Sequence, residues 1–394
     1  MKDNSVCSAN GLNNNINISP NDIPKSRPNI IYAILGGIIL LLFALSIIFI
    51  ALYTHEKDKH PNVIIYSQNP ENSTNYTPLS LWNENSPKET LINYMTEITD
   101  ENSDLYIPKK DRIAVFDFDG TLFQETDPMY CDYKIYIYRV LYDPDYKDKA
   151  TQDQIDLANE IKDGGLPSLT RRHAELNAQI YKDMTLDEVY KYTKNYLEQP
   201  SDGYNNMKRG DAFYKPMLEV VDYLQKNDFL VYVVSGTDRF TARAIIDGKM
   251  NIPKRQIIGT EAKIITTKQG DTDGFDYVYT QNETLKFKGE LIAKNLNMNK
   301  VTYIIKEIGK VPVLCFGNSG SDSSMCDYAI SNDKYYGMAF MLLCDDFERE
   351  NGNQARADKV QTLCENNGYI PVSMKNDWKT IYGDNVTRKN NSTS

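Results

Sequence analysis

Apolar residues follow three patterns along this chain, and each pattern predicts a different kind of element. Residues 30–53 form one run without a charged residue, dominated by Ile and Leu. Shorter uninterrupted runs, such as residues 113–116, are typical of strands buried on both faces of a parallel sheet. Elsewhere after residue 78, apolar residues recur every three to four positions, which predicts amphipathic helices. Strands that alternate with helices indicate an α/β fold with a doubly wound, Rossmann-like parallel sheet.

The run at residues 30–53 is long enough to cross a membrane. As a helix, its 24 residues would span about 36 Å, against roughly 30 Å for the hydrocarbon core of a bilayer. A secretory signal peptide is the alternative, but such peptides have shorter apolar cores and end in a small-residue cleavage site. The sequence Thr54-His55-Glu56-Lys57 offers no such site. We therefore expect a single transmembrane helix that anchors the protein in a membrane.

The charges that flank this run predict its orientation. Slightly more basic residues precede the run than follow it closely, which favours a cytoplasmic N-terminal tail at residues 1–29. The domain that follows would then be extracytoplasmic, joined to the helix by a polar stalk at residues 54–78 that is rich in Asn, Ser and Pro. The basic residues compared are Lys2, Lys25 and Arg27 on one side and Lys57 and Lys59 on the other.

Two carboxylates directly follow the strand predicted at residues 113–116. They belong to the segment Asp117-Phe118-Asp119-Gly120-Thr121. Residues two apart in an extended chain point the same way, so Asp117 and Asp119 can face one site while Phe118 faces the core. The C-terminal edge of the strands is where open α/β sheets bind their ligands. An acidic turn that merely ends a strand is the alternative interpretation, and three later segments argue against it.

These later segments follow in an order that suits a phosphoryl-transfer site. The first ends a strand predicted at residues 230–234 and precedes a predicted helix, where a hydroxyl, a glycine and free N–H groups can bind phosphate. The second places a lysine in an amphipathic segment at residues 285–296. The third ends a strand predicted at residues 311–316. The segments are Ser235-Gly236-Thr237, then Lys288 with Lys286 as the alternative lysine, and Gly317-Asn318-Ser319-Gly320-Ser321-Asp322.

The ordered set resembles the haloacid dehalogenase-like hydrolase superfamily, and within it the phosphoserine-phosphatase-like phosphatases, over roughly residues 110–345. The resemblance implies that Asp117 is the nucleophile that forms an aspartyl-phosphate and that Asp119 is the general acid/base. The expected function is hydrolysis of a small phosphorylated substrate. Alternatives are a weakly active or silent binding or scaffolding domain, a phosphotransferase and a dehalogenase, although a dehalogenase would not need Asp119. Expected phosphate contacts are Thr121, Ser235, Gly236 and Lys288.

A Mg²⁺ cofactor is expected at the same place, because an oxygen-only ligand set suits this cation and several carboxylates would otherwise repel phosphate. Candidate ligands are the Asp117 carboxylate, the Asp119 backbone carbonyl, Asp322 and Asn318. The commonest pattern of the resembling family has an aspartate where this chain has Asn318. Whether Asn318 or Asp322 is the direct ligand therefore stays open.

More than 100 residues separate the first and second motifs, and their pattern is helical. An insert at this point matches the helical cap of the resembling family. We expect a cap at residues 124–210 and a catalytic core at residues 79–123 and 211–394. Predicted helices lie at 86–98, 129–142, 151–163, 168–184, 185–199, 238–247 and 355–365, and further predicted strands at 256–259, 263–267, 275–280 and 338–343, with capping boxes at Ser86 and Thr185.

Composition excludes some classes of function. The net charge of −10 argues against a nucleic-acid-binding surface. Three histidines give no support to a histidine nucleophile or a zinc cluster. The six cysteines show neither a metal-ligand spacing nor a compact disulfide pattern, and Cys315, in a predicted buried strand, is expected to be a small core residue.

Overall fold

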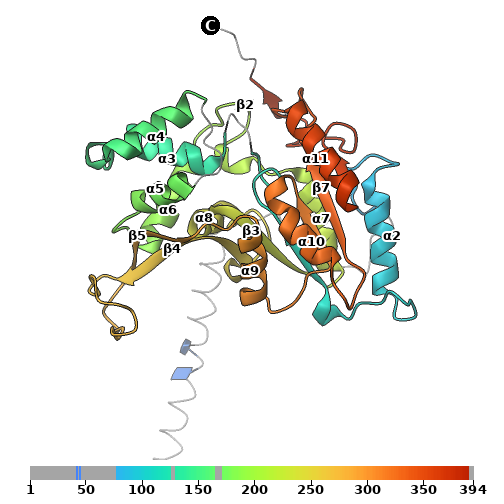
Figure 1. Ribbon diagram of the computed structural model, residues 1–394, viewed down its shortest axis with the longest axis horizontal. Coiled ribbons are helices and arrows are strands. Elements are labelled where there is room, and N and C mark those ends of the chain that lie inside the picture. The colour runs from blue at the N-terminus through green and yellow to red at the C-terminus, as the bar shows by residue number, and fades with distance from the viewer. Residues whose placement is uncertain (1–40, 43, 46–76, 126–128, 165–170, 390–394) are drawn as a thin grey trace, which may run out of the picture. The chain divides into compact units, whose positions relative to one another are not determined.

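The computed structural model describes residues 41–42, 44–45, 77–125, 129–164 and 171–389 (Figure 1). Contacts along the chain separate residues 1–68 from a compact unit at residues 69–394. The predicted membrane run lies outside the described residues except for Leu41, Leu42, Ala44 and Leu45, which are helical. Within the part of the chain that is described, no helix is long and apolar enough to span a membrane. The membrane anchor and its orientation stay predictions.

The compact unit is built on a seven-stranded sheet with the strand order β5-β4-β3-β1-β6-β7-β8. Neighbouring strands are parallel except for β4 and β5, which are antiparallel. This mostly parallel sheet with helices packed on it confirms the predicted α/β class. The strands are β1 (Ile113–Phe116), β3 (Leu230–Asp238), β4 (Ile257–Thr266), β5 (Leu285–Ala293), β6 (Leu314–Gly317), β7 (Met338–Leu343) and β8 (Ile370–Ser373).

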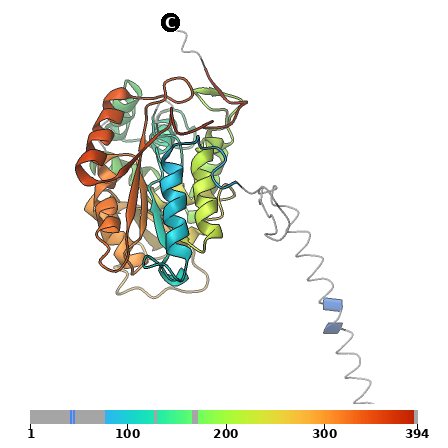
Figure 2. The same cartoon turned by 90° about the vertical axis from the view of Figure 1, so that its right-hand side faces the viewer.

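The central strand β1 is buried on both faces, as its unbroken apolar run predicts. Successive side chains alternate between two hydrophobic cores: Phe116 belongs to one and Val115 to the other. On the first face, Phe116 stacks on Phe316 of β6 with a centroid distance of 4.3 Å. That face is covered by α2 (Pro87–Thr99), α7 (Lys215–Lys226) and α8 (Arg239–Ile246), and the other by α9 (Met298–Glu307), α10 (Ser323–Ile330) and α11 (Gln354–Asn367) (Figure 2).

Four helices lie between β1 and α7 in the chain and gather together beside β4 and β5 (Figure 1). The predicted capping box at the start of the last of them is present, because the Thr185 side chain accepts from Glu188 N and Glu188 accepts from Thr185 N. The helices match the pattern expected of a cap, but the division of the chain into cap and core stays a prediction. They are α3 (Cys131–Leu141), α4 (Gln152–Lys162), α5 (Arg171–Ile180) and α6 (Leu186–Leu197).

Two predictions about secondary structure are wrong in the β4–β5 region. Residues 285–293, expected to begin an amphipathic segment at 285–296, form strand β5, and residues 275–280 form turns and loop instead of a strand. β5 is held by its pairing with β4 and by Phe287, which is fully buried between Tyr181 and Phe240. These contacts come from distant parts of the chain. Phe275, by contrast, is 95% exposed, so its apolar character marks no buried strand.

The ends of the compact unit meet each other. Trp378 packs edge-on against Trp82 with a centroid distance of 5.8 Å, and both rings are buried. Lys379 N donates to Leu81 O, which ties the C-terminal segment to the residues that precede α2. The capping box predicted at Ser86 is not formed, because the Ser86 hydroxyl donates to Asn83 O. A short sheet of β2 (Tyr204–Asn205) and β9 (Thr387–Arg388) ties the C-terminal segment to the residues between α6 and α7.

Candidate active site

The turn after β1 directs two carboxylates into one pocket. Asp117 and Asp119 both line it, while Phe118 between them is fully buried. Gly120 continues the turn with a φ of +83°, a left-handed conformation that favours glycine. A Cβ atom at this position would lie 2.0 Å from the Asn318 side chain. The turn therefore requires glycine for two reasons: its left-handed backbone conformation and the close contact with the Asn318 side chain.

Lys300 is the cation that holds Asp117. Its Nζ lies 2.5 Å from Asp117 Oδ1 and 2.6 Å from Asp322 Oδ1, and it donates to Val234 O at 2.8 Å. The lysine is completely buried. Burial opposes its charge, but Asp117 and Asp322 outweigh that effect and hold the pKa of the Lys300 ammonium above its usual range. Lys300 therefore fixes the orientation of the Asp117 carboxylate.

Asp322 shapes the loop after β6 and does not line the pocket. Its Oδ2 accepts hydrogen bonds from Asn318 N at 3.1 Å and from Ser319 N at 3.0 Å, and its Oδ1 is bound to Lys300. The side chain is fully buried. Both carboxylate oxygens are thus occupied by protein donors, whereas the Asn318 side chain faces the pocket.

The oxygens around Asn318 fit a hard cation. One terminal atom of the Asn318 amide lies 3.2 Å from the Asp119 backbone carbonyl oxygen and 3.2 Å from Asp117 Oδ2. If this atom is nitrogen, it donates two hydrogen bonds; if it is oxygen, three oxygens converge. An octahedral Mg²⁺ with ligands at 2.0–2.1 Å separates adjacent ligand oxygens by about 3 Å. The geometry favours Asn318 over Asp322 as the third ligand.

This ligand set would contain only one carboxylate. Among the residues that the structure describes, no group of three or more His, Cys, Asp or Glu side chains is placed to hold a metal ion. Asp117 would supply the single charge, and Asp119 and Asn318 would supply neutral carbonyl oxygens. A site of this kind has room for water and substrate phosphate, which Mg²⁺ prefers to keep in its shell.

The two carboxylate oxygens of Asp119 have different surroundings. Its Oδ2 accepts a hydrogen bond from Thr237 Oγ1 at 2.7 Å, while Oδ1 has no partner among the described residues. Burial, followed by the negative charge of Asp132, raises the pKa of Asp119 well above its ordinary value. Burial and Asp322 likewise raise the pKa of Asp117 to about 7, against the lowering effect of Lys300. Two carboxyl groups with different partners can divide the roles of nucleophile and acid.

The segment Ser235-Gly236-Thr237 forms part of the pocket wall through its backbone and the Thr237 side chain. Gly236 and Thr237 line the pocket, whereas Ser235 is fully buried and its Oγ accepts from Thr237 N at 3.0 Å. Thr121 is also fully buried, with its Oγ1 3.4 Å from Asn318 Oδ1. Of the expected phosphate contacts, Gly236 alone lines the pocket, and Ser235 and Thr121 support residues that do.

Lys288, the remaining expected phosphate contact, is not brought to the pocket. It lies on β5, where its Nζ pairs with Glu290 at 3.1 Å and with Asp271 at 3.4 Å. The alternative lysine, Lys286, pairs with Asp183 at 2.7 Å. The lysines at the site are Lys300 and Lys294, which the sequence reasoning missed. The sequence did contain a signal for Lys300: the residue lies on the apolar, buried face of α9 with Val301 and Ile304, where a lysine is unusual.

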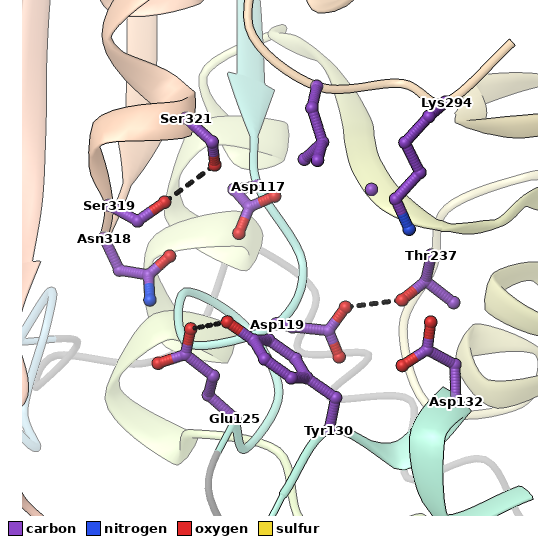
Figure 3. A pocket seen from close by; sticks show the side chains of 12 residues that line it. Asp117, Asp119, Glu125, Tyr130, Asp132, Thr237, Lys294, Asn318, Ser319 and Ser321 are labelled. Carbon is purple, nitrogen blue, oxygen red and sulfur yellow. Dashed lines mark hydrogen bonds between the residues drawn. The ribbon is translucent and has the colours of Figure 1, made fainter. Parts of the chain in front are cut away.

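Residues from the predicted cap and its connection close the pocket on the other side (Figure 3). Glu125 accepts from Tyr130 Oη at 2.5 Å and pairs with Arg356 of α11 at 2.5 Å. The cavity volume is about 30 Å³, enough to hold water. The complete lining is Asp117, Asp119, Glu125, Tyr130, Asp132, Gly236, Thr237, Lys294, Leu296, Asn318, Ser319 and Ser321.

These features define an α/β protein with a carboxylate pair and a buried lysine at the carboxyl end of the central strand of its sheet. The model of the haloacid dehalogenase-like hydrolase family matches residues 114–325, more than half of the chain. The chain belongs to this family. A comparison with curated proteins finds no significant match.

Several solved structures are similar to this chain at low sequence identity. A conserved protein of unknown function from Anaerococcus prevotii DSM 20548 is 12% identical, with a TM-score of 0.45, over 74% of this chain and 94% of that one. Cytosolic 5′-nucleotidase IIIB bound to cytidine is 11% identical, with a TM-score of 0.44, over 73% and 86%. A phosphoserine phosphohydrolase-like protein from Francisella tularensis subsp. tularensis SCHU S4 is 16% identical, with a TM-score of 0.36, over 66% and 94%.

Proposed function

We propose that this protein is a Mg²⁺-dependent phosphomonoester phosphatase that acts through an aspartyl-phosphate at Asp117. The observation that carries the proposal is the presence of Asp117 and Asp119 in one pocket, where one buried oxygen of Asp119 has no partner among the described residues. A nucleophile and an adjacent acid are the two groups that stepwise phosphoryl transfer requires. A dehalogenase would have no use for the second acid, so this pairing favours a phosphatase.

In the first step, an Asp117 carboxylate oxygen forms a bond to phosphorus while the ester P–O bond breaks. Asp119 gives its proton to the leaving alkoxide, so the alcohol departs neutral. In the second step, Asp119 takes a proton from water, the resulting hydroxide attacks phosphorus, and the Asp117 carboxylate leaves with release of inorganic phosphate. Lys300 holds Asp117 in place through both steps, since it is bound to Oδ1.

Mg²⁺ would supply positive charge that offsets the carboxylates and the phosphoryl oxygens. Asp117, the Asp119 backbone carbonyl and Asn318 are the residues that would hold it. Gly236, on the opposite wall of the pocket, would contact the phosphoryl oxygens through its backbone. Thr237 would act through Asp119, to which its hydroxyl donates.

We also propose that residues 30–53 anchor the enzyme in a membrane and that its catalytic domain is extracytoplasmic. The length of the apolar run and the basic excess before it support this part of the proposal. It is independent of the catalytic proposal, and each can fail alone.

The catalytic proposal is tested with the full-length chain in detergent and p-nitrophenyl phosphate as substrate. Asp117→Asn keeps the shape of the side chain and removes the attacking charge, so kcat should fall by a factor of about 10³ or more. Removal of Mg²⁺ by a chelator should abolish turnover, and added Mg²⁺ should restore it. Asp148→Asn, an exposed position in the same region of helices, is the matched control. Near-parental turnover by Asp117→Asn would refute the proposed nucleophile.

A further inference from the structure

Lys294 is a cation at the active site with no role in the proposed chemistry so far. It follows β5 directly, and its backbone is fixed by its neighbour Asn295, which is fully buried. Asn295 Nδ2 donates to Ser235 O at 3.0 Å, and Asn295 N donates to Thr260 Oγ1 at 3.1 Å. The Lys294 side chain points into the pocket beside Thr237 (Figure 3). The position of this lysine is thus set by the core of the fold.

The other cations around the pocket are occupied, and Lys294 is not. Lys300 is bound between Asp117 and Asp322, and Arg356 is bound to Glu125. For Lys294, no carboxylate of the described residues lies within ion-pair distance. An unpaired ammonium in a largely buried site lacks hydrogen-bond acceptors that water or a ligand must supply.

Asp132 faces Lys294 from the other side of the pocket. It is the second residue of α3, in the predicted cap, and is 6% exposed. Its Oδ1 accepts from Tyr133 N at 2.9 Å, and no side chain of the described residues donates to its carboxylate. The Lys294 ammonium and the Asp132 carboxylate therefore lie in one pocket without forming an ion pair. Each can still make further hydrogen bonds.

Lys294 and Asp132 lie next to Asp119 in the pocket (Figure 3). Burial lowers the pKa of Lys294, and Asp132 and Asp119 exert the largest opposing effects, because their negative charges favour its charged form. Asp119 is the group that would protonate the leaving oxygen. A group beside Asp119 and away from Asp117 meets the alcohol part of the substrate, and not the phosphoryl group.

We propose that Lys294 and Asp132 form the specificity contact for the leaving alcohol, and that the alcohol carries a further hydroxyl group. Lys294 Nζ donates to this hydroxyl, and the Asp132 carboxylate accepts from it. A hydroxyl is the small group that can satisfy a donor and an acceptor at once. The natural substrate class would then be phosphorylated polyols and sugars. This inference rests on the proposed phosphatase activity.

The test compares two substrates that differ in one hydroxyl, 2-hydroxypropyl phosphate and n-propyl phosphate, with the full-length protein and Mg²⁺. The parental enzyme should favour the hydroxylated ester in kcat/KM by at least about tenfold, because the analogue leaves Lys294 and Asp132 unpaired. Equal efficiency with the two esters would overturn the inference. Hydrolysis of p-nitrophenyl phosphate is measured in parallel, so that failure of the proposed phosphatase activity is distinguished from failure of the specificity contact.

Variants separate a specificity contact from a structural role. Lys294→Met and Asp132→Asn should each reduce the preference for 2-hydroxypropyl phosphate to about twofold or less. A merely structural role would lower kcat/KM for both esters by the same factor and leave their ratio unchanged, which would overturn the inference. Lys263→Met and Asp148→Asn, both outside the pocket, are the matched controls and should keep the parental ratio.

Discussion

Replacing Lys300 with methionine should destabilise the fold far more than replacing an exposed lysine that makes an equally short ion pair. Lys300 is completely buried, and its ammonium binds two carboxylates and a backbone carbonyl, at 2.5, 2.6 and 2.8 Å. Methionine keeps most of the apolar stem in place, so the cavity left behind is small. The main consequence is the loss of the charge between Asp117 and Asp322.

The magnitude follows from the burial of the partners. Removing one partner of a buried ion pair costs about 3–5 kcal/mol, because the remaining charge is left without compensation in a medium of low polarity. One of the two carboxylates can take up a proton, which limits the cost to this range. Lys310→Met is the comparison: Lys310 pairs with Asp111 at 2.6 Å, but its side chain is 44% exposed. Exposed pairs contribute about 0–1 kcal/mol.

The assay is urea denaturation of the detergent-solubilised chain, followed by tryptophan fluorescence. Trp82 and Trp378 are the only two tryptophans of the chain and are packed together in the core, so their emission reports the loss of the fold. With a slope of about 3 kcal/mol per molar urea, Lys300→Met should lower the midpoint by about 1–1.7 M. A midpoint equal to that of Lys310→Met would refute the reasoning that Lys300 is the buried charge on which the site depends.

Three further outcomes are expected. Asn318→Asp adds a charge to the proposed ligand set and should lower the Mg²⁺ concentration for half-maximal activity by roughly tenfold; an unchanged or higher requirement would place the cation elsewhere. Lys288→Met should leave kcat/KM within about twofold of the parent, because its partners lie on β5 and in the adjacent loop; a loss of several orders of magnitude would return Lys288 to the phosphate site. The full-length chain should stay in the membrane pellet after alkaline extraction, whereas a variant lacking residues 30–53 should not; release of the intact parent would contradict the anchor.

The parts of the site that were predictable are those encoded within a few residues. An unbroken apolar run followed by Asp117 and Asp119 predicts a buried strand with both carboxylates at its end, and period-two alternation predicts which residue between them is buried. The Thr185 capping box is local for the same reason. In these cases the interacting groups are close in sequence, so backbone geometry alone sets their positions.

The lysine assignment depended on contacts between distant residues. Lys288, Lys294 and Lys300 lie within one short segment, and which of them meets Asp117 is decided by the antiparallel pairing of β4 with β5 and by the start of α9. The question of Asn318 or Asp322 depended on both local and distant contacts. Asp322 Oδ2 binds the backbone of its own loop, a local contact, and Oδ1 binds Lys300. No local pattern contains the contact with Lys300.

Reductive trapping of the phosphorylated enzyme tests the central claim most directly. Borohydride reduces an aspartyl-phosphate to homoserine, so mass spectrometry of the protein quenched during turnover identifies the residue that carried the phosphoryl group. We predict homoserine at position 117, none there in Asp117→Asn, and more at position 117 in Asp119→Asn with an aryl phosphate, because that variant lacks the base for the second step. Turnover without homoserine at position 117, or homoserine at another carboxylate, would contradict the account.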